Sequence, residues 1–275
     1  MRINNNITAI NSHRQYTINN NNIGKNVEKL SSGFRVNRAA DDAAGLAISE
    51  KMRAQIRGLN MASKNSQDAV SLVQIAEGGM QTIQDILQRM RELAVQAASD
   101  TNETKDRQAL QLEIDELVAE VDQIAETTEF NEMKLLDGSA PFGKGTGGII
   151  QAGANATQTM SILISSMNAS GLGIDKVDIS NYTKASAALG MITTALTSVS
   201  MARAKLGAYQ NRLEYKIKNL DNAAENMAAA ESRIRDADMA KMMTEFTKNN
   251  ILFQASTAML AQANALPQGV LQLLG

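Results

Sequence analysis

Apolar residues recur at steps of three and four positions from Ala69 to Ala97, and this is the pattern of a heptad seam along one long helix. The seam consists of Ala69, Val73, Ala76, Met80, Ile83, Leu87, Met90, Ala94 and Ala97. Polar residues from Ser99 to Asn102 end the pattern, and Thr101 or Asn102 can begin another helix. That helix has a seam of its own, at Leu110, Ile114, Leu117, Val121 and Ile124. A short loop between two such helices predicts an antiparallel pair.

A third and longer seam begins at Ala185 and continues to Ile234. A helix of about 50 residues would be about 75 Å long, and a small domain cannot enclose such a rod. We therefore expect it to lie along the other helices. Three seam positions are polar, and we expect Arg203, Gln210 and Glu231 to fix the register of packing or to face a gap.

The two ends of the chain carry weaker helical patterns. Near the amino terminus the periodic apolar residues are interrupted by the asparagine tract 19–22, and asparagine is a poor helix former. Near the carboxyl terminus the pattern continues through Phe246, Phe253 and Leu260 into an apolar tail. A single chain has no obvious way to cover these apolar residues, so we expect both ends to be ordered by partners.

The region 139–181 differs in composition from the helical segments, with glycine-rich turn signals and no helical period. Short apolar or alternating runs at 149–153 and 159–164 flank a loose turn, which predicts a β-hairpin. The expected fold class is mainly α: a long antiparallel helical bundle or coiled coil with a small β-hairpin region.

Composition limits the function. The chain has 275 residues, a net charge of -2, no cysteine and 3% aromatic residues. The charge gives no reason to expect nucleic acid as a partner. The sequence has no stretch of about 18 unbroken apolar residues, the length that would predict a membrane span. The first residues contain no apolar signal-peptide core.

Catalytic chemistry is not indicated. His13 is the single histidine, and it has neither a cysteine nor a second histidine with which to share a metal. No nucleophile elbow, phosphate-binding loop or dinucleotide fingerprint is present. The acidic residues between Glu113 and Asp122 surround a hydrophobic seam and are expected to form a solvated face. We therefore expect no enzyme activity, no metal and no cofactor.

One segment, 30–59, joins two helical stretches through a turn rich in charge. Gly33 can adopt a positive φ and end a helix, and Asp41 or Asp42 can cap the next one. The run Asn37-Arg-Ala-Ala-Asp-Asp-Ala-Ala-Gly-Leu-Ala-Ile48 resembles the amino-terminal signature of bacterial flagellins. The ending Pro267-Gln-Gly-Val-Leu-Gln-Leu-Leu274 is similar to their carboxyl terminus. The resemblance is to a short flagellin with little or no outer domain.

This resemblance implies a structural subunit that polymerises into the flagellar filament used for swimming. It implies an inner terminal coiled-coil domain made of 1–33 and 240–275, and a helical rod domain of 34–239 that contains the hairpin region 139–181. Two sets of residues are then expected to contact other subunits. The charged set is Arg35, Arg38, Asp41 and Asp42, and the apolar set is Ile3, Ile7, Ile10, Phe246, Phe253, Leu260, Leu271 and Leu274.

The resemblance also implies partners and a location. The subunit would pass through the flagellar export channel without a cleaved signal, held by an export chaperone, and would meet the filament cap and hook-junction proteins outside the cell. The segment from Gln88 to Gln96 is similar to the one that the animal Toll-like flagellin receptor recognises. Arg89, Leu93 and Glu113 would be the contacts, with Arg89 and Leu93 on one helix face that lies off the packed seam.

Three other interpretations stay open at this point. A hook-filament junction protein shares the flagellin ends, although the nearly complete signature and the ending favour flagellin itself. A chemoreceptor-type signalling coiled coil would show similar heptads but needs a membrane span or an input domain. A small-molecule-binding bundle would need polar residues that converge within a seam.

Overall fold

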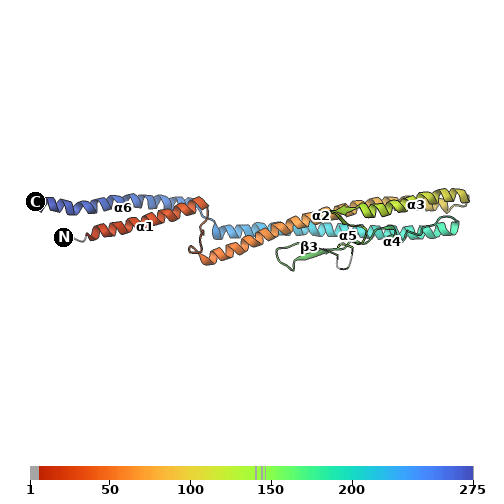
Figure 1. Cartoon of the computed structure of the whole chain (residues 1–275), viewed down its shortest axis with the longest axis horizontal. Helices are drawn as coiled ribbons and strands as arrows, with labels where there is room; N and C mark the ends of the chain where they lie inside the picture. The colour runs from red at the N-terminus through yellow and green to blue at the C-terminus, as the bar shows by residue number, and fades with distance from the viewer. Residues whose placement is uncertain (1–5, 140, 144, 146, 275) are drawn as a thin grey trace. The chain divides into compact units, whose positions relative to one another are not determined.

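The computed structural model describes residues 6–139, 141–143, 145 and 147–274, and the side chains of 267–274 lie outside the described residues. The chain divides into two units, one made of Met1–Ala54 with Asn226–Gly275 and the other of Gln55–Glu225. Helices dominate both (Figure 1), as the sequence predicts. The elements are α1 (Ile7–Ser32), α2 (Ala43–Ala97), α3 (Thr104–Thr127), β1 (Glu129–Phe130), β2 (Met133–Lys134), β3 (Gly148–Gln151), β4 (Thr159–Ile162), α4 (Ala169–Leu172), α5 (Tyr182–Arg235) and α6 (Met239–Leu274).

The unit Gln55–Glu225 is built around one continuous core shared by α2, α3 and α5. All nine predicted seam residues of α2, from Ala69 to Ala97, are 2% exposed or less, so that prediction is confirmed. Ile114 and Val121 of α3 are fully buried, while Leu110, Leu117 and Ile124 are partly buried against the same core. The periodicity therefore identified the packed face of each helix.

The polar seam residue Arg203 of α5 contacts two polar residues of α2. Its guanidinium donates to Gln84 Oε1 at 2.8 Å and forms an ion pair with Glu77 at 3.4 Å. These contacts agree with the prediction that Arg203 fixes the register, while its buried Nε has no hydrogen-bond partner among the described residues. A guanidinium in a seam stabilises the packing only where its donors find acceptors, and this requirement favours one alignment of the two helices.

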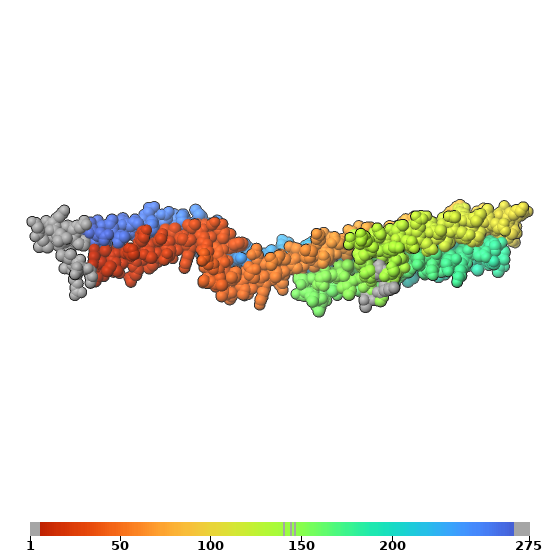
Figure 2. Space-filling model, in the orientation of Figure 1, coloured from red at the N-terminus to blue at the C-terminus, as the bar shows by residue number. Residues whose placement is uncertain are grey.

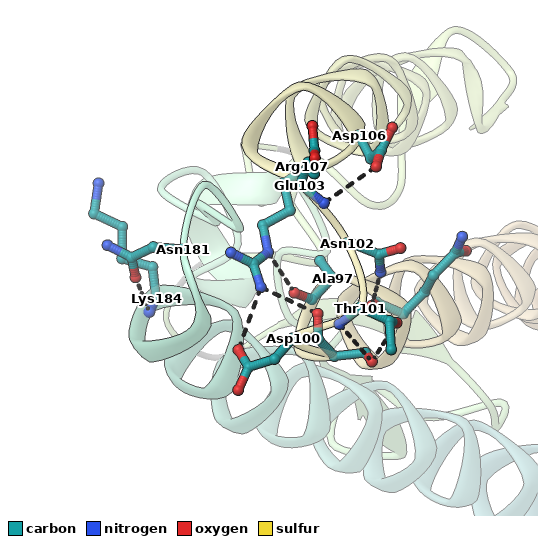
Figure 3. Close-up of polar contacts among 11 residues, drawn as sticks. Ala97, Asp100, Thr101, Asn102, Glu103, Asp106, Arg107, Asn181 and Lys184 are labelled. Atoms are coloured by element: carbon teal, nitrogen blue, oxygen red, sulfur yellow. Dashed lines mark hydrogen bonds and ion pairs between the residues drawn. The ribbon is translucent and has the colours of Figure 1, made fainter.

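Arg107 holds the turn between α2 and α3 together (Figure 3). Its guanidinium donates to the Ala97 and Ser99 carbonyls at 3.0 and 3.1 Å and lies 3.6 Å from the Asp100 carboxylate. The prediction that Thr101 or Asn102 begins α3 is wrong: the N-cap is Glu103. Its N–H donates to the Asp106 carboxylate at 3.1 Å, while the residues before it are held in the turn.

The predicted hairpin is confirmed as the antiparallel pair β3 and β4, with Gly148 opposite Ile162 and Gln151 opposite Thr159. It lies against α2 within the same unit, as Figure 2 shows in green against orange. A Cβ on Gly58 of α2 would come within 3.0 Å of the Ala154 side chain. The hairpin turn therefore approaches α2 at a position without a side chain. The pair β1–β2 and the short helix α4 were not predicted.

Two adjacent glycines in α2 differ in their surroundings. A Cβ on Gly79 would lie 2.7 Å from Thr128 Oγ1 and 2.9 Å from Leu136 Cδ1, whereas a Cβ on Gly78 would meet nothing within 4 Å. Gly79 thus gives the segment that follows α3 room to pack against α2.

In the other unit, α1 and α6 lie side by side over most of the length of α1 (Figure 1). Asn6 contacts Ala263 and Asn19 contacts Ser256, so rising numbers in α1 meet falling numbers in α6. The two terminal helices therefore form an antiparallel pair.

By length and composition α5 is apolar enough to cross a membrane, whereas the sequence predicted no span. A core helix passes the same test, and the stripe Ala185, Ile192 and Val199 of α5 is fully buried in the core of Gln55–Glu225. The length and composition of α5 are therefore only weak evidence for a membrane span.

Candidate functional site

The charged segment between α1 and α2 is held by its own carboxylates. Gly33 ends α1 with φ +73°, as predicted. The Asp41 carboxylate accepts from the Arg38 and Asn37 N–H groups at 3.1 and 3.2 Å. The hydrogen bond from the Arg38 N–H, with a second from Asn37, lowers the pKa of Asp41 below its usual value. Asp42 accepts from the Gly45 N–H at 2.8 Å and caps α2, so the predicted capping is confirmed.

The two arginines of this segment also find partners within the chain. Arg35 donates to the Ile234 carbonyl at 2.5 Å, and Arg38 forms an ion pair with Glu28 at 2.8 Å. The Arg38 side chain is nevertheless 73% exposed. Of the four charged residues expected at subunit contacts, Arg35, Arg38 and Asp41 are exposed and Asp42 is half-buried.

A second connection in the same unit joins this segment to the end of α5, and the sequence analysis missed it. Phe34 pairs with Asp236 in an antiparallel bridge, and the Arg35 N–H donates to the Arg235 carbonyl at 2.7 Å. The Arg235 guanidinium lies 4.9 Å from the centre of the Phe34 ring and 2.5 Å from a Glu50 carboxylate oxygen. No local spacing signals a contact between residues about 200 positions apart.

The contact between α1 and α6 combines polar side chains with apolar ones such as the buried Met242. Asn19 Nδ2 donates to Ser256 Oγ at 2.8 Å, and Asn6 Nδ2 donates to the Ala263 carbonyl at 2.7 Å. Asn26 is 9% exposed, and its Nδ2 has no hydrogen-bond partner among the described residues. Asn19 of the tract 19–22 thus contacts the partner helix, whereas Asn20 and Asn21 are exposed, and sequence reasoning did not assign this role to Asn19.

Large apolar side chains lie on the outside of this pair. Ile7 and Ile10 of α1 are both 61% exposed, and Ile251 and Met259 of α6 are 62% and 61% exposed. The pair therefore leaves several large apolar side chains of both helices exposed to water.

The other apolar residues expected at subunit contacts are placed differently. Phe246, Phe253 and Leu260 are half-buried, and the Phe253 ring lies 5.0 Å from the Tyr16 ring. Ile3 lies outside the described residues, as do the side chains of Leu271 and Leu274.

The three residues of the expected receptor contact fall into two groups. Arg89 donates to Glu113 at 2.8 Å across α2 and α3, and this exposed ion pair raises the pKa of the Arg89 guanidinium. Leu93 lies off the Met90/Ala94 seam, but it is 1% exposed and belongs to the core, so it is not on the surface where the receptor contact was expected. A helix with two neighbours buries a wider face than one heptad stripe.

Candidate metal ligands are not gathered in the described residues. Within the part of the chain that the structure describes, no group of three or more histidine, cysteine, aspartate or glutamate side chains could hold a metal ion. His13 is exposed on α1 and lies 6.4 Å from the Tyr16 ring.

Comparisons with known proteins match one family at both ends of the chain. The model of the bacterial flagellin N-terminal helical region matches residues 3–140, and the model of the C-terminal helical region matches 189–274. The chain is 54% identical to a flagellin of Halalkalibacterium halodurans over 276 residues and 53% identical to one of Bacillus subtilis over 303 residues. Both alignments cover 100% of each chain.

Solved structures give a similar result. The crystal structure of Bacillus cereus flagellin matches with 33% identity and a TM-score of 0.50, over 61% of this chain and 94% of that one. A putative flagellar hook-associated protein from Vibrio parahaemolyticus matches with a TM-score of 0.58 at 12% identity, over 71% of this chain and 100% of that one. The second likeness shows the fold alone, which a junction protein would share.

Proposed function

Because this chain belongs to the bacterial flagellin family, and so is a non-catalytic subunit that polymerises into the extracellular flagellar filament, we propose that α1 and α6 are its polymerising element. The observation that supports this proposal is that Ile10 and Met259 are each 61% exposed on the outside of the pair. Burying such side chains against other copies removes apolar surface from water, at about 25 cal/mol per Å².

In this proposal the inner terminal coiled-coil domain comprises 1–33 and 240–275, and both segments become fully ordered on assembly. The rod domain comprises 34–239, with the hairpin region 139–181 on its side. The apolar residues Ile3, Ile7, Ile10, Phe246, Phe253, Leu260, Leu271 and Leu274 line contacts between subunits. Arg35, Arg38, Asp41 and Asp42 shape the adjoining segment, and the exposed charge of Arg38 gives that segment an outward contact.

The test uses the full chain with substitutions on the exposed face of the pair. Ile7→Gln, Ile10→Gln and Met259→Gln are combined in one variant, and Met61→Gln, Leu112→Gln and Met201→Gln form the matched control, since all six side chains are 58% to 69% exposed. We expect seeded wild-type and control chains to form filaments in negative-stain images and to sediment, and the terminal variant to stay monomeric. Filaments from the terminal variant would refute the assignment.

The family membership suggests further partners, which we also propose. An export chaperone would cover α6 before assembly, since Ile251, Leu252 and Met259 are exposed there. The chain would leave through the flagellar channel without a cleaved signal and would meet the cap and hook-junction proteins. A pull-down from lysate with the full chain, compared with a chain that ends at Ala237, tests the chaperone contact: equal capture by both would refute it.

For recognition by the animal Toll-like flagellin receptor, we propose Arg89 and Glu113 as the contacts. They form an exposed ion pair on adjacent helices, while the burial of Leu93 assigns that side chain a packing role. Arg89→Ala is expected to weaken receptor activation by monomers, and Lys64→Ala on the same helix is the control. Unchanged activation by Arg89→Ala would refute the contact.

A further inference from the structure

A groove in the unit Gln55–Glu225 lies between the hairpin and α5. Arg212, Tyr215, Lys216 and Asn219 line it from α5, Thr159 and Met160 line it from β4, and its volume is about 330 Å³. Arg212 and Lys216 are four residues apart and so lie one above the other on the helix. Both cations and an aromatic ring therefore face one concave surface, which we call the basic groove.

The charges of the basic groove are not neutralised within the chain. Among the described residues, neither Arg212 nor Lys216 has an acidic group within 4.0 Å. The Tyr215 side chain beside them is 73% exposed, and Lys218 lies 5.7 Å from the centre of its ring. A third cation thus adds to the positive field at the edge of the groove.

A surface of opposite charge lies on α3 of the same unit. Glu116 and Glu120 are exposed, and neither has a cationic partner among the described residues. They too are four residues apart and so share one face of their helix. We call these two residues the acidic ridge, since they project from a helix.

We propose that the basic groove of one subunit receives the acidic ridge of a second copy of this chain. Arg212 with Lys216 and Glu116 with Glu120 have the same spacing, about 6 Å along their helices, so both charges can pair at one helix crossing. Neither surface is covered within the chain that carries it. The groove also presents the Tyr215 ring and the Thr159 side chain, against which the stems of two glutamates can pack.

The symmetry of the contact supports a second copy as the occupant. The two surfaces differ from each other, so a contact between them is heterologous: each added subunit uses one of its two surfaces and leaves the other free. Repeated without closure, such a contact generates a helical fibre, and this inference rests on the polymerisation proposed above. The apolar pair α1–α6 supplies affinity in that scheme, and the charged contact fixes how neighbouring rods align.

The test measures elongation of filament fragments by the full chain, followed by light scattering. One variant carries Arg212→Glu with Lys216→Glu, a second carries Glu116→Lys with Glu120→Lys, and a third carries all four changes. Two controls have equal changes of charge elsewhere in the unit: Lys64→Glu with Lys105→Glu, and Glu126→Lys with Asp175→Lys. Circular dichroism checks the helix content of each variant, and Arg212→Gln with Lys216→Gln replaces the first variant if that one unfolds.

We expect the first two variants to elongate at least about tenfold more slowly than the wild type, a loss equivalent to about 1.4 kcal/mol. The four-change variant restores attraction with the signs exchanged, so its elongation rate should be within about threefold of the wild-type rate. Wild-type elongation should slow between about 0.01 and 1 M salt, where the Debye length falls from about 30 to about 3 Å.

Three results would overturn the inference: elongation of the single-sided variants at the wild-type rate, no recovery in the four-change variant, or an equal loss in either control. These outcomes leave wild-type polymerisation intact, so they are distinct from a failure of the proposed polymerising element. A wild-type chain that does not elongate at all would refute that element and this contact together.

Discussion

Gly78 and Gly79 allow one substitution to be compared at two adjacent positions of α2. Replacing a helical glycine by alanine stabilises an exposed helix by about 1 kcal/mol, and this contribution is the same at both sites. The surroundings differ, because a Cβ on Gly79 would lie 2.7 Å from Thr128 Oγ1 and 2.9 Å from Leu136 Cδ1. At Gly78 the added Cβ would meet nothing within 4 Å.

The atoms near Gly79 cannot move away easily. The Thr128 hydroxyl donates to the Ile124 carbonyl at 2.7 Å, and Leu136 is fully buried in the core. Inserting a methyl group into such packing costs about 1–3 kcal/mol. We therefore expect Gly78→Ala to raise the free energy of unfolding by up to about 1 kcal/mol. Gly79→Ala should be about 1–3 kcal/mol less stable than Gly78→Ala, since the helix propensity cancels in the comparison.

Thermal denaturation of the depolymerised chain, followed by far-ultraviolet circular dichroism, measures the difference. In a unit of roughly 150–250 residues, 1 kcal/mol shifts the Tm by about 2–4 °C, so the two variants should differ by about 2–12 °C. A Gly79→Ala chain as stable as Gly78→Ala would mean that the segment around Thr128 and Leu136 does not pack on α2. The reasoning about this glycine would then be refuted.

Three further predictions concern the same unit. Leu87→Ala, at a fully buried position, should cost about 2–5 kcal/mol, whereas Leu112→Ala, at 69% exposure, should change the Tm little; equal shifts in denaturation would contradict the core assignment. Hydrogen bonds from Lys184 and from the Ser180 backbone N–H lower the pKa of Asp178 from 3.8 to about 2. The resulting stability is present above pH 3.8 and lost as pH falls toward 2, so the Tm difference between wild type and Asp178→Asn should shrink over that range. Because both partners are about half exposed, the contribution to the free energy of unfolding stays below about 1 kcal/mol. A Tm difference independent of pH would refute the linkage. Arg107→Lys should speed amide exchange at 96–104, because one ammonium cannot replace a fork that reaches two carbonyls, and unchanged exchange would show that the turn holds without it.

Periodicity predicted the packed faces of the long helices because burial along a rod repeats with the helix. The nine-residue seam of α2 was complete, and the hairpin at β3 and β4 followed from two short runs around a turn. Leu93 was misplaced because the width of a buried face depends on how many helices pack against it. The seam of a single helix does not show how many other helices pack against it.

The candidate site was predictable only where its contacts are local. The capping by Asp42 and the helix end at Gly33 depend on a few neighbouring residues, and both were predicted. The Phe34–Asp236 bridge joins segments far apart in the chain, and no local pattern encodes it. The asparagine tract of α1 was interpreted only as a weak point of the helix, because composition does not show which face an asparagine presents to a partner helix.

The exposed apolar side chains of the α1–α6 pair make assembly depend on temperature. When subunits bury Ile7, Ile10, Ile251 and Met259 against one another, heat capacity falls, as it does whenever apolar surface leaves water. Apolar association weakens on cooling. We therefore expect the concentration of free subunit in equilibrium with filament to rise in the cold, so that chilling releases subunits and warming returns them to the polymer.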